Sequence, residues 1–408
     1  MIPIDGFTKE ILMHGLSRIM VEDFDDIDNT TLAEIFKNYV YSFKEKLKNA
    51  GSSKLSRNDK ESYKKTYQNW FNTTPPEEYT SLMLDIIEKT INLLEGNKID
   101  AKKSLGTIKV GKNSVDFGIP YNGSYAILPA IIKQVEYYEF LSEFLTPTTG
   151  KKSMINLDPI WFSILAIGFL TCFAGYYGGK YYLMLKNDIE RYYLAIKYGM
   201  EEEKYELLEI LEDLEILTDI NIQKRFSLEV EEIYELLLSM ELAKKKASGK
   251  VFPITLYVIE RGNVYLAKNV LELDLRNSLN FMKKYIDRIK NYSMFESSDA
   301  KIPLEELLYL ALKELKNPIN EDNENLAYIM VKDLYRVINS GKVEILENTL
   351  YLLLRKGHSI LSSKSRSKSK LNLEKTFKSF AKEGNIISIL EGILWLDIIT
   401  QSLKNLEK

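Results

Sequence analysis

One stretch of this chain constrains its fold more than any other, because it contains no charged side chain. It runs from Pro159 to Gly179 (PIWFSILAIGFLTCFAGYYGG), and its glycine-rich end continues into Lys180-Tyr181-Tyr182. If it crosses a bilayer, the chain is a membrane protein. If it is a buried helix that ends in a tight turn, it forms the centre of a soluble protein.

The length of the apolar part favours the buried helix. Fifteen residues, from Pro159 to Phe173, reach ~22 Å as a helix, which is short of the ~30 Å core of a bilayer. The glycines that follow disfavour a longer helix, and Asp158-Pro159 is typical of a helix start. Lysines lie on both sides, so no orientation bias is visible. We therefore expect a buried helix from Pro159 to Phe173, with a single membrane span as the alternative.

The overall composition indicates an ordinary globular protein. The chain has 408 residues, of which 45% are hydrophobic and 28% charged. Its one cysteine, Cys172, excludes an intramolecular disulfide and a cysteine-based zinc cluster. The N-terminal residues lack the pattern of a signal peptide, which predicts a cytoplasmic location.

No motif in the sequence indicates catalysis. The two histidines, His14 and His358, belong to no metal-binding pattern, so we expect neither a metal nor another cofactor. Gly178-Gly179-Lys180 resembles the end of a phosphate-binding loop, but Ala174 and Tyr181 replace the glycine and the hydroxyl residue that such a loop requires. The sequence therefore predicts a protein that is not an enzyme.

The charge of the chain is unevenly distributed. Between Glu201 and Glu241 fourteen acidic residues face three basic ones, a local net charge of −11, whereas the whole chain carries −3. The remainder is accordingly basic, by about +8 when the local charge is subtracted. Such polarity suits a protein that meets an anionic polymer on one side, although a solvated pair of acidic helices explains the acidic part equally well.

Periodicity predicts a mainly α protein with small β-hairpin inserts (α+β) and a C-terminal helical bundle. Hairpins are expected within residues 106–125, at the Gly178-Gly179 turn, and within residues 254–275. We divide the chain into an α-rich part with a small hairpin (1–150), a central part with the buried helix, the Gly/Tyr turn and a β insert (151–275), and the bundle (276–408). The expected helices cover residues 30–48, 63–71, 76–95, 127–145, 201–217 and 228–246, and the chain from residue 278 onward.

Three sets of residues are candidates for nucleic-acid contacts. The first is a basic hairpin whose Gly-Lys-Asn tip carries donors suited to base edges, with two lysines just before it. The second is the tyrosine turn, where aromatic faces surround a lysine. The third is a Ser/Lys loop with alternating cations suited to phosphates. These sets are Lys102, Lys103, Lys109, Lys112 and Asn113; Tyr177, Lys180 and Tyr181; and Lys364, Arg366, Lys368 and Lys370.

The run Leu157-Asp-Pro-Ile-Trp-Phe162, followed by Phe173-Ala-Gly-Tyr-Tyr-Gly-Gly-Lys-Tyr-Tyr182, resembles the large subunit of the archaeal type I-A CRISPR interference complex, Cascade. The resemblance covers about 26 residues and the overall plan of the chain. Some members of that family carry cysteine pairs that indicate a zinc site. A chain with one cysteine cannot form such pairs, so no metal role is carried over.

The resemblance implies a non-catalytic subunit that recognises the protospacer-adjacent motif in duplex DNA, aids its opening and supports docking of the helicase-nuclease in antiviral defence. The implied partners are the CRISPR RNA, the duplex target DNA, the Cascade backbone and small subunits, and the helicase-nuclease, with no membrane. Two other classes remain open from the residues alone. They are a single-span membrane protein with soluble lobes and a helical protein-protein scaffold without a nucleic-acid role.

Overall fold

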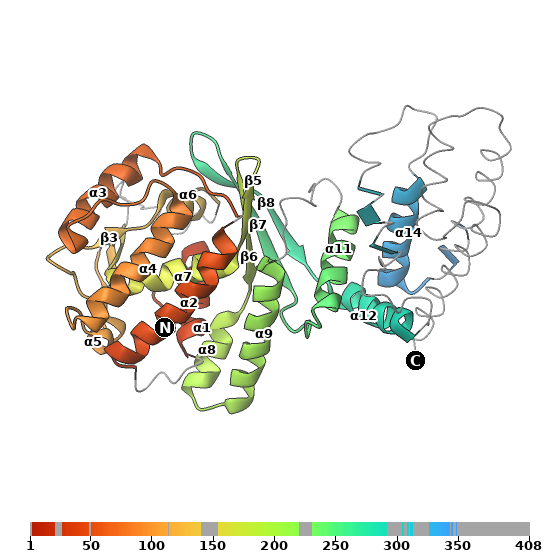
Figure 1. Ribbon diagram of the computed structural model, residues 1–408, viewed down its shortest axis with the longest axis horizontal. Helices are drawn as coiled ribbons and strands as arrows, with labels where there is room; N and C mark the ends of the chain where they lie inside the picture. Colours follow the sequence, from red (N-terminus) through yellow and green to blue (C-terminus); the bar gives the residue numbers. More distant parts are fainter. Residues whose placement is uncertain are drawn as a thin grey trace. The chain divides into compact units, whose positions relative to one another are not determined.

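The computed structural model describes residues 2–20, 27–48, 50–112, 114–139, 154–219, 231–291 and 326–342, and the single positions 304, 305, 308, 309, 311, 312, 344, 345 and 348 (Figure 1). The chain divides into two compact units. The first combines Met1–Arg225 with Lys250–Leu273, and the second combines Phe226–Gly249 with Asp274–Lys408.

Helices predominate among the described residues of each unit, and the described strands form two small sheets in the first unit, which confirms the predicted fold class. The helices of the first unit are α1 (Phe7–Met20), α2 (Asn29–Leu47), α3 (Arg57–Phe71), α4 (Tyr79–Glu95), α5 (Ala101–Leu105), α6 (Ala130–Glu139), α7 (Pro159–Cys172), α8 (Ile189–Lys197) and α9 (Glu201–Asp219). Those of the second unit include α11 (Glu231–Lys244), α12 (Arg276–Asn291) and α14 (Leu326–Ser340).

Helix α7 is the centre of the first unit, and every one of its 14 residues is buried. Its first turn is capped by Asp158, whose carboxylate accepts from the Trp161 amide, and Pro159 follows the cap as the sequence predicts. Helices α1 and α4 pack against it. The contact with α1 is so close that a Cβ at Gly168 would lie 1.9 Å from the Ile11 carbonyl oxygen.

No helix in the described part of the chain is long and apolar enough to cross a membrane. The expected buried helix is therefore present, and it ends at Cys172, one residue earlier than expected. Phe173 then adopts an extended backbone and begins strand β5 (Phe173–Tyr177).

Helix α7 connects the two sheets. The first has the order β1-β2-β4-β3, and the second has the order β5-β6-β7-β8. Their strands are β1 (Ile108–Val110), β2 (Ser114–Phe117), β3 (Ala126–Ile127) and β4 (Met154–Leu157), and β5, β6 (Lys180–Lys186), β7 (Ile254–Arg261) and β8 (Tyr265–Leu273). The pairs β1–β2, β5–β6 and β7–β8 are antiparallel, which confirms the three predicted hairpins.

Several boundaries differ from the sequence-based expectation. Helix α3 begins at Arg57, six residues before the expected start at residue 63, because Ser56 accepts from the Asp59 amide and caps it. Helix α4 begins at Tyr79 rather than at Pro76, and α6 at Ala130 rather than at residue 127. Strand β4 was not expected, and it pairs with β2 in parallel, with Val115 opposite Ile155.

In the second unit, α11, α12 and α14 pack against one another. The buried face of α12 includes Phe281 and Tyr285, whose stacked rings have centroids 6.2 Å apart. Lys244 on α11 forms an ion pair of 2.6 Å with Glu305.

Candidate nucleic-acid interface

The β1–β2 hairpin carries the first predicted set of cations. Val110 pairs with Val115, and the Gly111 amide donates to the Ser114 carbonyl oxygen at 2.7 Å, which closes the turn. Lys109 and Lys112 are exposed on this hairpin. Asn113, the other predicted tip residue, lies outside the described residues.

Helix α5 supplies the second pair of predicted cations, Lys102 and Lys103, and both are exposed. The helix leads directly into the hairpin, since the Gly118 amide at the end of β2 donates to the Thr107 carbonyl oxygen at 2.8 Å. Lys103 forms an exposed ion pair of 3.2 Å with Asp100, and such pairs contribute little to stability. The structure thus brings the four described lysines of this set onto one helix-hairpin element.

Asp158 fastens this element to the start of α7. Its Oδ2 accepts from the Ser104 hydroxyl of α5 at 2.5 Å and from the Ile119 amide after β2 at 2.9 Å, while Oδ1 caps α7. Burial raises the pKa of Asp158 to about 6, although these donors act to lower it. One buried carboxyl group therefore holds a helix start and the base of the hairpin together.

The close approach to Asp158 depends on a glycine. Gly118 has a φ of +82°, and a Cβ built there would lie 1.9 Å from Asp158 Oδ2. A side chain at this position would be strained and would displace the carboxyl group. Trp161 completes the joint, with its ring 5.0 Å from the Phe117 ring and its indole N–H donating to the Ser104 carbonyl oxygen at 3.1 Å.

The tyrosine turn is built differently. Gly178 and Gly179 both have positive φ, at 58° and 81°, as a two-residue hairpin turn requires. Tyr177 and Lys180 flank this turn as a cross-strand pair, and Tyr177 is exposed whereas Lys180 is half-buried. Lys180 also pairs across the sheet with Glu260.

Tyr181 lies in the core, not on the surface. Its hydroxyl accepts from the Ser53 amide at 2.7 Å, and its ring is 4.6 Å from that of Tyr176 and 5.9 Å from that of Phe173. Burial raises the pKa of its hydroxyl to about 12. A ring enclosed in this way offers no face to a base, so we remove Tyr181 from the candidate contact set.

The two described sets are separated. The hairpin is bonded to the cap at the start of α7, whereas the tyrosine turn follows β5, which begins at the end of α7. Helix α7 itself is ~21 Å long. In Figure 1, α5 and β5 accordingly lie on opposite sides of the first unit. The third predicted set, Lys364, Arg366, Lys368 and Lys370, lies outside the described residues.

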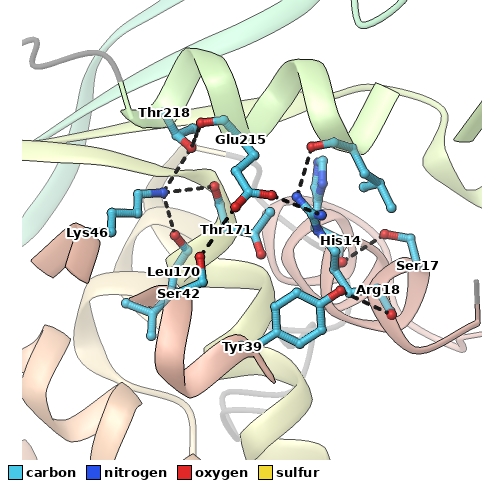
Figure 2. A network of polar contacts seen from close by, with 11 residues as sticks. His14, Ser17, Arg18, Tyr39, Ser42, Lys46, Leu170, Thr171, Glu215 and Thr218 are labelled. Carbon is cyan, nitrogen blue, oxygen red and sulfur yellow. Dashed lines mark hydrogen bonds and ion pairs between the residues drawn. The ribbon is translucent and has the colours of Figure 1, made fainter. Parts of the chain in front are cut away.

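A network of buried polar groups lies at the far end of α7 (Figure 2). The Lys46 ammonium donates to the carbonyl oxygens of Leu170 and Thr171 at 2.9 and 3.3 Å and to the Thr218 hydroxyl at 2.9 Å. A cation suits the carbonyl end of a helix. Burial nevertheless lowers the pKa of Lys46 to about 7.

Two members of this network lie on α1, of which Arg18 contacts α9 and His14 contacts β6. Arg18 donates to the Leu211 carbonyl oxygen at 3.0 Å and approaches Glu215 at 3.8 Å. His14 Nε2 accepts from the Lys186 amide at 3.1 Å, and burial lowers the pKa of His14 to about 3, so the imidazole is neutral. Burial also raises the pKa of the nearby Cys172 thiol, which disfavours a nucleophilic thiolate. Arg18 thus joins α1 to α9, and His14 joins α1 to the end of β6.

The first unit holds a second group of cations, which the sequence alone did not indicate. Arg57, Lys133 and Arg261 line one cavity, although they are separated along the chain by some 70 to 130 residues. Each stands alone in its own segment, so no local charge pattern marks them. The only sequence signal was the Arg261-Gly262-Asn263 turn, whose first residue reaches the cavity.

Among the described residues, no group of three or more His, Cys, Asp or Glu side chains is placed to hold a metal ion. Comparison with curated proteins and with solved structures gave no match. A family profile described as "CRISPR-associated protein (Cas_Csx9)" matches residues 16–390, which is most of the sequence and includes both units. The chain therefore belongs to the Cas_Csx9 family of CRISPR-associated proteins.

Proposed function

We propose that this protein is the large, non-catalytic subunit of a cytoplasmic type I-A Cascade complex and that it recognises the protospacer-adjacent motif in duplex DNA. Membership of a CRISPR-associated family supports a role in such a system. Its partners in this proposal are the CRISPR RNA, the target DNA, the backbone and small subunits, and the helicase-nuclease that docks after the duplex has opened.

The observation that carries the proposal is the shape and mounting of the basic hairpin. Lys109 lies on β1, the edge strand of the first sheet, and Lys112 lies at the tip of the β1–β2 hairpin, which is suited to enter the major groove of B-DNA. Lys102 and Lys103 lie on the adjoining helix, where they suit contacts with phosphates. The bonds to Asp158 fix the base of the hairpin, and a fixed reader loses little conformational entropy on binding.

In this proposal, the lysines of α5 and the residues at the hairpin tip make different kinds of contact with DNA. Ammonium groups on α5 neutralise phosphates and position the protein without reading sequence. Lys112 and Asn113 at the tip donate to base edges and supply the sequence preference. Exposed Tyr177 and half-buried Lys180 form a second element at the tyrosine turn, which we assign to contact with the nucleic-acid backbone.

The test uses the assembled complex and a randomised duplex library, from which the wild type selects its preferred motif. Lys112→Ala with Asn113→Ala should weaken binding to the selected motif by about 1–3 kcal/mol per lost base contact, with little change on unselected duplex. Lys65→Ala, at an exposed lysine of α3, is the matched control and should bind like the wild type.

The other outcomes are also informative. If both duplexes weaken equally, the tip holds phosphates and the reader lies elsewhere. If neither weakens, the hairpin is not part of the interface. If the wild-type complex selects no motif at all, the proposed function itself is wrong.

The Ser/Lys loop has its own test. Neutralising Lys364, Arg366, Lys368 and Lys370 together should reduce the slope of log K against log salt by about 3 to 4 if all four contact phosphates. An unchanged slope would exclude the loop from the interface.

A further inference from the structure

A cavity of about 470 Å³ opens in the first unit, away from the basic hairpin. Three segments converge on it: the beginning of α3, the beginning of α6, and the turn between β7 and β8. Its volume falls within the ~300–1,000 Å³ typical of small-molecule sites.

The charges around this cavity are predominantly positive. Arg57, Lys133 and Arg261 line it, one from each of the three segments, against a single acidic residue, Asp59. The side-chain amides of Asn58, Gln134 and Asn263 add further hydrogen-bonding groups. Three cations that line one cavity from separate elements suit a ligand with more than one negative charge.

Asp59 is already committed to the protein. Its Oδ2 accepts from the Tyr79 hydroxyl at 2.6 Å and from the Ala130 amide at 2.9 Å, so it caps α6 from the wall of the cavity. Burial raises the pKa of Asp59, although these donors oppose the shift. The carboxyl group thus holds α3 to α6, and it also interacts electrostatically with Lys133. Three cations against one acidic residue still give the lining an excess of positive charge.

The turn that carries Arg261 is held in place before any ligand arrives. The guanidinium Nη1 donates to the Lys54 carbonyl oxygen at 2.8 Å, and its centre lies 5.8 Å from the Tyr265 ring. The Tyr265 amide donates to Gln134 Oε1 at 2.7 Å, which joins the turn to α6. A guanidinium positioned in this way keeps donors on its other nitrogen atoms.

Arg57 is the adjustable member of the three. It is the first residue of α3, and its side chain is 91% exposed and only 3.4 Å from Glu61, a weak surface pair. An arginine of this kind can turn onto a phosphate and bind it with two parallel hydrogen bonds.

We propose that this cavity binds a phosphate group, either that of a nucleic-acid strand or that of a free nucleotide, through Arg57, Lys133 and Arg261. The inference goes beyond the proposed function and does not rest on it, because it uses neither the hairpin nor duplex recognition. A carboxylate ligand would satisfy one or two of the cations, whereas a phosphate offers enough oxygen atoms for all three.

The experiment is calorimetric titration of the purified full chain at low salt with three probes: adenosine 5′-monophosphate, adenosine, and a short 5′-phosphorylated single-stranded oligonucleotide. The monophosphate or the oligonucleotide should bind, and adenosine should not. Arg57→Gln should weaken binding about tenfold, the equivalent of ~1.4 kcal/mol for one charge-assisted contact. Lys65→Gln, on the same helix but outside the cavity, is the matched control and should have no effect.

The two phosphate sources are distinguished by the probes. Equal affinity for the monophosphate and the oligonucleotide identifies a nucleotide site, and binding of the oligonucleotide alone identifies a strand site. The proposal is overturned if adenosine binds as well as its monophosphate, if no phosphate probe binds, or if Arg57→Gln and Lys65→Gln behave alike. Lys112→Ala should retain this binding, so failure here and failure of the hairpin proposal are distinguishable.

Discussion

Each end of helix α7 is bound to its neighbours by one ionisable side chain, and the two side chains have opposite charge. At the amino end, the carboxyl group of Asp158 receives donors from α5, the hairpin and the helix itself. At the carboxyl end, the Lys46 ammonium donates to the last carbonyl oxygens and to α9. Each end therefore has the charge that the helix dipole favours, negative at the start and positive at the end.

The ends differ in what they present to solvent. At the amino end, Asp158 is bonded to a hairpin with exposed lysines. At the carboxyl end, the chain enters β5, where the Phe173 ring packs against Tyr181 and Tyr177, next to the glycine turn, is exposed. The comparison shows that the most conspicuous stretch of a sequence need not form the functional surface. The glycine-tyrosine run contributes Phe173 and Tyr181 to the core, and the base-reading surface that we propose lies at the other end.

Removal of the carboxyl group at the amino end should have the largest effect. Asp158→Ala leaves the Ser104 hydroxyl and the Ile119 and Trp161 amides without their acceptor, and it removes a helix cap. We expect the free energy of unfolding to fall by about 3 kcal/mol or more, measured by denaturant titration. Asp116→Ala is the matched control, because Asp116 is a half-buried carboxylate on β2 that accepts from the Asn156 amide at 2.7 Å and caps no helix. An equal loss in both variants would contradict the special role of Asp158.

The polar network near the carboxyl end of α7 should make the free energy of unfolding depend on pH. The pKa of His14 is about 3 in the folded protein and near 6.5 when unfolded, so the unfolded chain binds the extra proton between these values and stability falls as the pH drops below 6.5. At pH 5 this amounts to about 2 kcal/mol.

The measurement compares His14→Gln with the wild type. The variant should gain about 2 kcal/mol relative to the wild type between pH 7 and pH 5, because glutamine does not titrate. The comparison is needed because burial raises the pKa of Glu10, Glu136 and Asp158, which shifts stability in the opposite direction over the same range. Parallel pH profiles would show that the imidazole is accessible to protons in the folded state.

A smaller loss is expected at the tyrosine turn. Tyr181→Phe removes the acceptor of the Ser53 amide while retaining the ring packing, and it should cost about 1 kcal/mol in thermal or chemical unfolding. Tyr177→Phe, at the exposed position of the same turn, should leave stability unchanged. The opposite ranking would place Tyr181 on the surface.

The smallest effect on stability is expected for the exposed lysines of the β1–β2 hairpin. Lys109→Ala and Lys112→Ala should alter the free energy of unfolding by less than about 0.5 kcal/mol, as is usual for exposed positions, so any loss of DNA binding reports on contact rather than on folding. A larger loss of stability would mean that these lysines support the hairpin.

Signals within short stretches of sequence were sufficient to predict individual helices and hairpins. They were insufficient to predict how these elements pack together. The Asp-Pro start, the apolar run and the paired glycines each act over a few residues, so α7 and the hairpins could be predicted. The pairing of β2 with β4 joins residues about 40 positions apart and leaves no local trace. Strand alternation could not show that Tyr181 points inward, because β6 is buried along nearly its whole length.

The candidate site was predictable to a similar extent. Clustered lysines on α5 and the hairpin stand out in the sequence, whereas the cavity cations meet only after three distant segments have folded together. Asp158 was recognised as a helix cap. Its bonds to α5 and the hairpin depend on tertiary structure and could not be inferred.

The shared carboxyl group also sets how the hairpin responds to load. A hinge at the base of the hairpin would have to break the bonds from Ile119 and Ser104 to the same side chain that caps α7. Bending the hairpin would therefore disturb the side chain that caps α7, the one helix without a charged residue among the described helices of the first unit. The hairpin and the core helix are thus coupled through one side chain, and a displacement of the hairpin base is expected to reach the start of α7.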